Sequence, residues 1–142
     1  MKISTKGRYA LDALFYIAMQ GENGTVKIKE ICNYNQVSQR YLEQIFFKLR
    51  KAGLLQTVRG KYGGYCLQKM PSEITVGQIL EAVEGQMVPV ACVHSVCPVK
   101  LEEFCMTKQI WCHISGAITD IIGKYTLEDL VKGYRDENID KR

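Results

Sequence analysis

Four of the six cysteines in this chain of 142 residues lie in one short stretch, together with both of its histidines. Consecutive cysteines of the stretch are separated by four, seven and six residues. Gathered thiolates are soft ligands that suit iron–sulfur clusters and zinc, so the stretch predicts a metal site. A thiol switch without metal is the alternative. The remaining cysteines, Cys32 and Cys66, are expected to pack as small apolar residues. The candidate ligands are Cys92, His94, Cys97, Cys105, Cys112 and His113.

Three of these cysteines form the best ligand set for one compact cluster. A helix rises about 1.5 Å per residue, so Cys112 would lie about 10.5 Å beyond Cys105 along its axis. The loop before the helix can fold the two earlier cysteines over the helix start. The expected metal ligands are therefore Cys92, Cys97 and Cys105, holding a 2Fe–2S or 4Fe–4S iron–sulfur cluster, with zinc as the alternative. The fourth ligand stays open among an external small molecule, His94, Cys112 and His113.

A long helix is expected to follow Cys97, the second of these cysteines. Pro98 suits a first helical turn and makes Cys97 the cap of a helix that runs to about Tyr125. Seven residues along it alternate at spacings of three and four, a heptad pattern that predicts a dimer interface. A helix packed on its own domain would give the same pattern. Thr126 then caps a short last helix, and a polar tail begins at Gly133. The heptad residues are Phe104, Thr107, Trp111, Ile114, Ile118, Ile121 and Tyr125.

The charge of the chain is divided unevenly between its two halves. Residues 1–70 carry 12 Lys and Arg against 4 Asp and Glu, which gives +8, and residues 71–142 carry 7 against 11, which gives −4. Such a division indicates a polyanionic partner for the first half only. A solvated lysine-rich surface would carry the same charge, so the order of the elements has to decide between the two.

The basic half has the order of elements of a helix-turn-helix. Ser4 or Thr5 can cap a first helix that runs to about Gln20. A short helix over about 27–32 and a turn over 33–36 follow. Ser38 then caps a longer helix that ends at Gly53. Its inward face is apolar, and its outward face has the composition of a recognition helix. That outward face carries Gln39, Arg40, Glu43, Gln44, Lys48 and Lys51.

A glycine-rich hairpin is expected directly after the recognition helix. Residues 54–59 and 65–68 form its strands, and residues 60–64 form its tip. Glycines let the backbone approach a phosphate closely, and Arg59 suits insertion into a minor groove. An ordinary surface hairpin is the alternative, but the order of helix, turn, helix and hairpin favours double-stranded DNA as the ligand. Lys6 and Lys48 are expected to contact phosphates.

Several motifs resemble the Rrf2 family of bacterial winged-helix regulators, and the resemblance extends from Met1 to about Val131. The motifs are residues 1–10, 41–44, 49–54, 58–60 and 63–65. The resemblance implies a dimeric repressor or activator that binds palindromic operators. It implies that Glu43 helps the protein to reject DNA sequences that are bound in only one state of the cluster. A carboxylate at this position can also accept a hydrogen bond from a cytosine amino group. It carries DNA contacts over to Ser38, Gln39, Arg40, Tyr41, Gln44, Arg59, Gly60 and Lys61.

The resemblance also bears on the cysteines. Many members of the family hold an iron–sulfur cluster on three cysteines before and at the start of a long dimerisation helix. Cys92, Cys97 and Cys105 occupy the matching positions. Two positions that supply a fourth ligand in other members hold Lys108 and Arg8 here, which leaves that ligand open. A cysteine-metabolism branch of the family shares the amino-terminal motifs but lacks the cysteine cluster.

These observations predict a mainly α fold with a small β-hairpin wing. The expected parts are a winged helix-turn-helix DNA-binding domain over 1–84 and a cysteine-bearing loop over 85–99. A dimerisation helix and a short terminal helix are expected over 100–132, and a polar tail over 133–142. The hydrophobic content of 46% allows a packed core. No apolar stretch approaches the ~20 residues of a membrane span, and nothing resembles a signal peptide, so we expect a cytoplasmic protein.

The function expected from the sequence is that of a homodimeric transcriptional repressor that senses iron–sulfur cluster or redox status. The main alternative is a regulator of sulfur or cysteine metabolism that uses zinc, a thiol switch or a partner enzyme. A further alternative is an interaction module that docks on a cysteine-metabolism enzyme through its acidic half. No carboxylate pair, phosphate-binding loop or nucleophile–base arrangement in the sequence indicates an enzyme.

Overall fold

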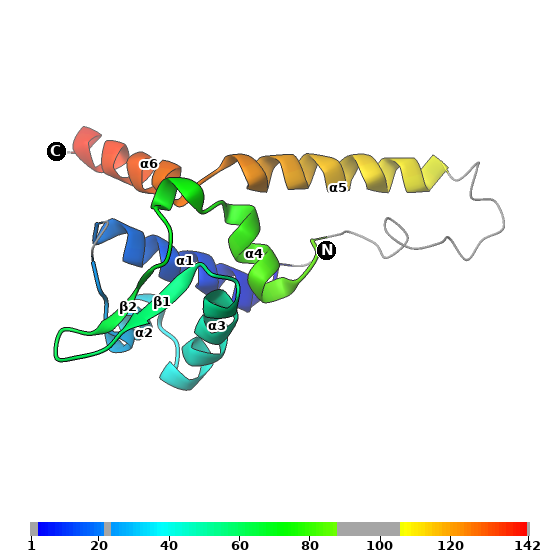
Figure 1. Cartoon of the computed structure of the whole chain (residues 1–142). Helices are drawn as coiled ribbons and strands as arrows, with labels where there is room; N and C mark the ends of the chain where they lie inside the picture. The colour runs from blue at the N-terminus through cyan, green and yellow to red at the C-terminus, as the bar shows by residue number, and fades with distance from the viewer. Residues whose placement is uncertain (1–2, 22–23, 88–105, 142) are drawn as a thin grey trace.

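The computed structural model describes residues 3–21, 24–87 and 106–141. Helices α1 to α4 and a two-stranded hairpin form one packed unit, and the last two helices run along one side of it (Figure 1). This arrangement confirms the mainly α fold with a hairpin wing. The elements are α1 (Thr5–Met19), α2 (Ile28–Asn35), α3 (Gln39–Lys51), β1 (Leu55–Val58), β2 (Gly64–Leu67), the short 3-10 helix η1 (Pro71–Glu73), α4 (Val76–Glu84), α5 (Met106–Lys124) and α6 (Leu127–Asp140).

Helix α1 lies at the centre of the packed unit. Ser4 caps it as predicted, because its side chain accepts a hydrogen bond from the Lys6 backbone N–H at 3.1 Å. Small residues on its inner face, such as Ala10 and Ala13, are completely buried. They let neighbouring helices approach closely, and α2, α3, α4 and α6 all contact α1.

Helix α2 is longer than the sequence predicted. The expected turn over 33–36 is wrong for its first three residues, which continue the helix to Asn35. The side-chain amide of Asn35 is buried and donates to the Tyr9 carbonyl on α1 at 3.0 Å, which holds this extra turn in place. The chain turns instead at Gln36, whose φ of 55° is left-handed. Ser38 then caps α3 as predicted, by accepting from the Tyr41 backbone N–H.

The hairpin packs on α3 and is tied to the segment before α2. Strands β1 and β2 are antiparallel, with Leu55 opposite Leu67 and Val58 opposite Gly64. Val26 forms an isolated bridge with Tyr65 beside them. A Cβ atom at Gly64 would lie 2.5 Å from the Val26 carbonyl oxygen, so this close approach requires glycine. The hairpin therefore projects from the domain with a defined base.

The junction between α5 and α6 is joined to the segment that precedes α4. The Val76 backbone N–H donates to the Tyr125 carbonyl, and the Leu127 N–H donates to the Ile74 carbonyl, each at 2.9 Å. Thr75 caps α4 through a reciprocal pair of hydrogen bonds with Gln78. These bonds attach the junction of the two C-terminal helices to the segment before α4, in addition to the contacts of α6 with α1 and of α5 with α4.

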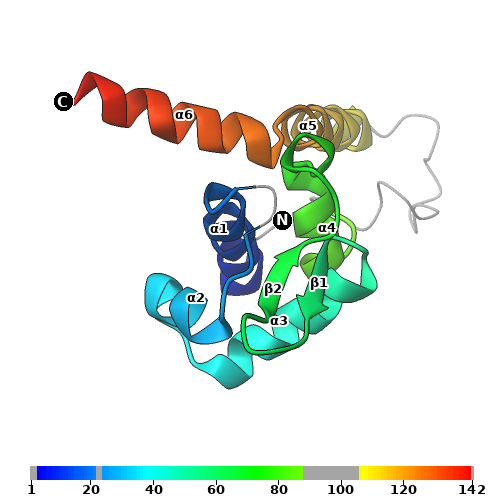
Figure 2. The same cartoon turned by 60° about the vertical axis from the view of Figure 1, so that its left-hand side comes forward.

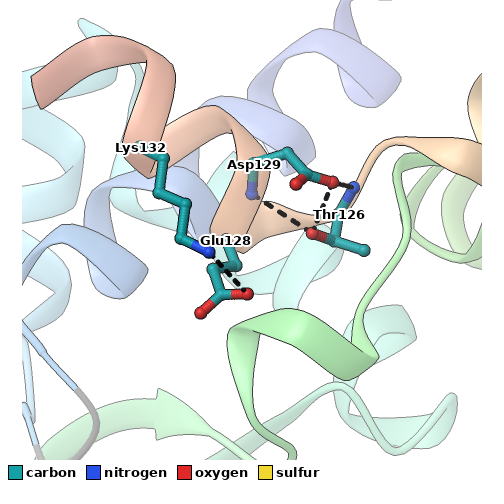
Figure 3. Close-up of polar contacts among 4 residues, drawn as sticks. All are labelled: Thr126, Glu128, Asp129 and Lys132. Atoms are coloured by element: carbon teal, nitrogen blue, oxygen red, sulfur yellow. Dashed lines mark hydrogen bonds and ion pairs between the residues drawn. The ribbon is translucent and has the colours of Figure 1, made fainter. Parts of the chain in front are cut away.

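Helix α6 begins at the predicted cap but continues further than expected. Thr126 and Asp129 form a reciprocal capping box, with N–H to side-chain oxygen distances of 2.9 and 3.2 Å (Figure 3). The polar tail predicted from Gly133 is wrong, because the helix runs to Asp140. Tyr134 packs edge-on against Phe15 of α1, with ring centroids 5.8 Å apart, and this contact supports the additional turns.

The core lies between α1, α3, α4, the hairpin and the start of α6. Cys32 is half-buried and packs against it, as predicted, and Cys66 is half-buried in β2. Burial, followed by the nearby Glu43 carboxylate, raises the pKa of the Cys32 thiol, which keeps it protonated. Within the described parts of the chain, no helix has the length and apolar character needed to cross a bilayer.

Candidate nucleic-acid interface and metal site

The outer face of α3 and the tip of the hairpin lie on the side of the molecule opposite α5 and α6 (Figures 1 and 2). Arg40 and Gln44 are exposed on α3, and Arg59, Gly60 and Lys61 are exposed at the hairpin. Two successive elements thus present cations and amides on the same side. This is the arrangement of a recognition helix with a wing.

The first turn of α3 carries a polar pair. The side-chain amide of Gln39 donates to a carboxylate oxygen of Glu43 at 3.0 Å, and both residues are exposed. A carboxylate beside a phosphate backbone weakens binding unless it accepts a hydrogen bond, and the cytosine amino group is the matching donor in the major groove. Gln39 fixes the direction in which Glu43 presents that acceptor.

Two of the residues expected to contact DNA make contacts inside the domain. Ser38 is occupied as the cap of α3. The Tyr41 hydroxyl lies 3.3 Å from the Thr5 hydroxyl, and the Tyr41 ring packs edge-on against Tyr9 at 6.0 Å between centroids. Tyr41 therefore joins the start of α3 to the start of α1 and fixes how the two helices are presented together.

Lys48 also has a partner within the protein. Its ammonium group donates to the Val83 carbonyl near the end of α4, at 2.9 Å. The bond attaches the middle of α3 to the carboxyl end of α4, where cations stabilise the last carbonyls of a helix. The structure thus gives Lys48 a packing role that the sequence did not reveal.

The hairpin tip has the geometry of a wing. Gly60 has a φ of 117°, a left-handed conformation that favours glycine. The Thr25 hydroxyl donates to the Tyr62 carbonyl at 3.0 Å and ties the tip to the segment before α2. The Lys61 ammonium lies 5.7 Å from the centre of the exposed Tyr62 ring. Arg59 and Lys61 therefore stand on either side of a fixed turn.

Lys6 lies in the exposed first turn of α1, beside a carboxylate supplied by α4. The same oxygen of Glu84 accepts from the backbone N–H groups of Ser4 at 3.0 Å and Gly7 at 2.9 Å, and from the Ser4 hydroxyl. A Cβ atom at Gly7 would lie 2.8 Å from this oxygen, so glycine leaves the room it needs. Glu84 thus binds the N-terminal end of α1, where anions are stabilised.

The charge on Glu84 is part of this contact. Burial alone would raise the pKa of Glu84, but the Ser4 hydroxyl, the two backbone N–H groups and the Lys6 charge together lower it. A carboxyl group whose pKa is lowered in the folded state stabilises the fold at pH values above 4.5, its ordinary pKa. This stabilisation is lost as the pH falls from that value through the lower pKa of the folded protein.

We expect Glu84→Gln to lower the free energy of unfolding by about 1–2 kcal/mol at neutral pH. The difference from the native chain should shrink when denaturant unfolding is repeated at a pH well below 4.5, because the native carboxyl becomes protonated as the pH falls through its lowered pKa. Glu81→Gln, one turn earlier on α4 and exposed, is the matched control and should change little at either pH. A loss at Glu84 that is equally large at both pH values would mean that its charge is not responsible.

Two exposed aromatic residues on this side were not among the predicted contacts. Phe47 of α3 is 67% exposed, and Tyr62 at the hairpin tip is 81% exposed. A signal for Phe47 was present in the sequence, because it falls on the polar face of an otherwise amphipathic helix. Tyr62 had a weaker signal, as an aromatic residue within a glycine-rich tip.

The predicted metal ligands are only partly described by the structure. Cys92, His94, Cys97 and Cys105 lie outside the described residues. Cys112 and His113 lie on α5, and both are exposed. Among the residues that the structure describes, no group of three or more His, Cys, Asp and Glu could hold a metal ion.

Helix α5 touches its own domain along one face only. Ser115 is buried, and a Cβ atom at Gly77 of α4 would lie 3.3 Å from the Ile122 side chain, so this face packs on α4. The predicted heptad residues lie mostly on another face. Of them, Phe104 lies outside the described residues and Ile118 is half-buried. The exposed members are Thr107, Trp111, Ile114, Ile121 and Tyr125.

Comparison with known proteins extends over nearly the whole chain. A family model described as Rrf2, iron-dependent transcriptional regulator, matches residues 3–133. The chain is 39% identical over 130 residues to the HTH-type transcriptional regulator CymR of Bacillus subtilis (strain 168). The aligned region covers 92% of this chain and 89% of that protein. It is 36% identical over 143 residues to the HTH-type transcriptional regulator IscR of Pectobacterium atrosepticum. That alignment covers 100% of this chain and 86% of the relative. The solved structure of CymR, the global cysteine regulator of B. subtilis, matches with a TM-score of 0.80 and 37% identity, over 93% of this chain and 97% of that one.

Proposed function

Because the chain belongs to the Rrf2 family of iron-dependent transcriptional regulators, we propose that it binds a palindromic operator as a homodimer and responds to an iron–sulfur cluster. Like its relatives, it is a DNA-binding transcriptional regulator and not an enzyme. The observation that carries the operator proposal is the exposure of α3 and the hairpin tip on one side, with cations on both. We propose that binding represses transcription.

The residues divide into base-reading and positioning groups. Arg40, Glu43 and Gln44 are proposed to read base edges in the major groove, from the exposed face of α3. Gln39 orients Glu43 through their hydrogen bond. The second group holds the helix start, contacts phosphates or places the wing in the minor groove. It comprises Lys6, Ser38, Tyr41, Arg59, Gly60 and Lys61.

The homodimer is proposed to form through α5. Four of its exposed heptad residues, Trp111, Ile114, Ile121 and Tyr125, are large and apolar, and a second copy of the same helix would cover them with the same pattern. A palindromic operator matches such a two-fold dimer, with one recognition helix in each half-site. The C-terminal helices join the DNA-binding domain next to α4, so the packing of two α5 helices would set the distance between the two recognition helices.

The available donor set fits an iron–sulfur cluster. Cys92, Cys97 and Cys105 supply three thiolates, and the exposed Cys112 and His113 of α5 offer a further thiolate or imidazole. When bound, the cluster supplies a redox-active centre that is sensitive to oxygen. The segment that would hold it connects α4 to α5, so the residues that bind the cluster also join the DNA-binding domain to the dimer helix.

The proposal is tested on protein purified without oxygen. We expect a broad absorbance band in the visible region, with iron and sulfide present in matching amounts. Cys105→Ala should lose both, whereas Cys66→Ala, at a half-buried cysteine in β2, should keep them. A native protein that is colourless and lacks iron would overturn the cluster proposal and leave DNA binding intact.

The similarity to CymR supports a second candidate, a regulator of sulfur or cysteine metabolism that holds no cluster. In that case the same cysteines would bind zinc, form a reversible disulfide, or act with a partner enzyme of cysteine metabolism. Zinc in the colourless sample would favour the first of these, and a disulfide that reductant removes would favour the second. Operator binding that requires the added enzyme would favour the third.

A further inference from the structure

Phe47 is a large apolar residue on the exposed face of α3. Its neighbour Phe46 is 1% exposed and packs in the core, whereas Phe47 is 67% exposed. A phenyl ring in water adds nothing to the stability of the fold, because the apolar contribution comes from burial. Single exposed apolar residues are common on protein surfaces, so the neighbours of Phe47 have to indicate whether and what it contacts.

Phe47 lies in the middle of the proposed DNA-reading face. Residues three and four apart are neighbours on a helix surface. Glu43 and Gln44 precede Phe47 by four and three residues, and Arg50 and Lys51 follow it by three and four. All four are exposed. Phe47 thus stands between hydrogen-bonding side chains on one side and cations on the other, along one continuous ridge.

A hollow beside Phe47 has polar and cationic walls. Its volume is ≈ 430 Å³, and it lies between the second half of α3 and strand β1. The polar part of its lining comprises Arg50 and Lys51 of α3 with Gln56, Thr57 and Gln68 from the hairpin, and Phe47 and Leu55 form the apolar part. Cations and amides complement phosphates and base edges, whereas an apolar protein segment would leave them without partners. The occupant that fits is the duplex already proposed for the recognition helix and the wing.

We propose that Phe47 reads a thymine in each half-site of the operator by apolar contact with its C5 methyl group. The thymine methyl is the one apolar group that base pairs present in the major groove, and phenylalanine is suited to contact it. Arg50 and Lys51 would hold the adjoining phosphates. This inference rests on the proposed function, since it adds one base-reading residue to the same interface.

The test uses a duplex that the protein itself selects. The full-length dimer is first used to enrich its tightest-binding duplex from a random library. Each thymine is then replaced in turn by deoxyuridine, which lacks the methyl group but keeps every hydrogen-bonding atom. Affinities are measured at one salt concentration for the native protein, Phe47→Ala and, as a control, Ile139→Ala, which removes an exposed apolar side chain from α6.

We expect one thymine position to stand out for the native protein. Replacing it in both half-sites should weaken binding about 15-fold, the effect of removing one buried methyl contact twice. Phe47→Ala should bind the thymine duplex more weakly and should no longer distinguish thymine from deoxyuridine at that position. Ile139→Ala should behave as the native protein does.

The outcomes separate this inference from the proposed function. If no replacement weakens native binding, or if Phe47→Ala is affected as strongly as the native protein, the inference is overturned while operator binding stands. If no duplex is enriched at all, the proposed operator binding is overturned, and the inference falls with it.

Discussion

Replacing Ile114 and Ile121 with glutamate is expected to convert the dimer into monomers and to weaken operator binding about 100-fold or more. Both isoleucines are exposed on the heptad face of α5, at 37% and 57%. In a dimer a glutamate on this face would be placed opposite its own copy, and burying two like charges costs far more than the apolar contact contributes. A monomer can occupy only one half-site, so the gain from simultaneous binding is lost.

The oligomeric state is measured by sedimentation, and affinity is measured on the selected duplex. Gln109→Glu with Gly116→Glu is the matched control, because it adds the same charge to α5 away from the heptad face. A Cβ atom at Gly116 would meet nothing within 4 Å. A folded double isoleucine variant that remains a dimer would show that α5 is not the dimer interface.

Phe46→Ala is expected to lower the free energy of unfolding by about 3–5 kcal/mol, a large share of the stability of a domain this size. The Phe46 ring is buried between α3 and the hairpin, with its centroid 4.7 Å from that of Tyr65. Its removal leaves a cavity and also loosens the base of the wing. The orientation of Arg59 relative to α3 should therefore become less defined.

The next residue provides the control for this prediction. Phe47→Ala removes the same side chain from an exposed position and should change stability by less than about 0.5 kcal/mol. Denaturant unfolding of both variants is compared at one protein concentration, because dimer stability depends on it. Equal losses for the two variants would contradict the assignment of Phe46 to the core and Phe47 to the surface.

The parts of the fold that could be predicted from the sequence are those with local causes. Ser4, Ser38 and Thr126 cap helices as expected, since a cap depends on residues within one turn. The apolar stripe of α3 and the glycines of the hairpin are equally local signals. The recognition helix and wing could therefore be placed before any tertiary contact was known.

The parts that could not be predicted depend on partners far away in the sequence. Helix α2 continues because Asn35 bonds to Tyr9, and α6 continues where Tyr134 packs on Phe15. The composition after Gly133 is polar, which local reasoning assigns to a tail. Lys48 has the side chain expected of a phosphate contact, but its ammonium group donates to the Val83 carbonyl, which lies 35 residues away in the sequence.

The end of α4 has a consequence for how the protein is made. Glu84 holds the start of α1 from 80 residues away, and Val83 accepts the bond from α3. Chains are synthesised from the N-terminus, and contacts between distant residues wait for loop closure. The ribosome must therefore extend the chain past the whole winged helix before its first helix and its recognition helix acquire these fixing bonds. Until then the bonds that align the first helix with the recognition helix cannot form, so this alignment depends on the last helix of the winged domain.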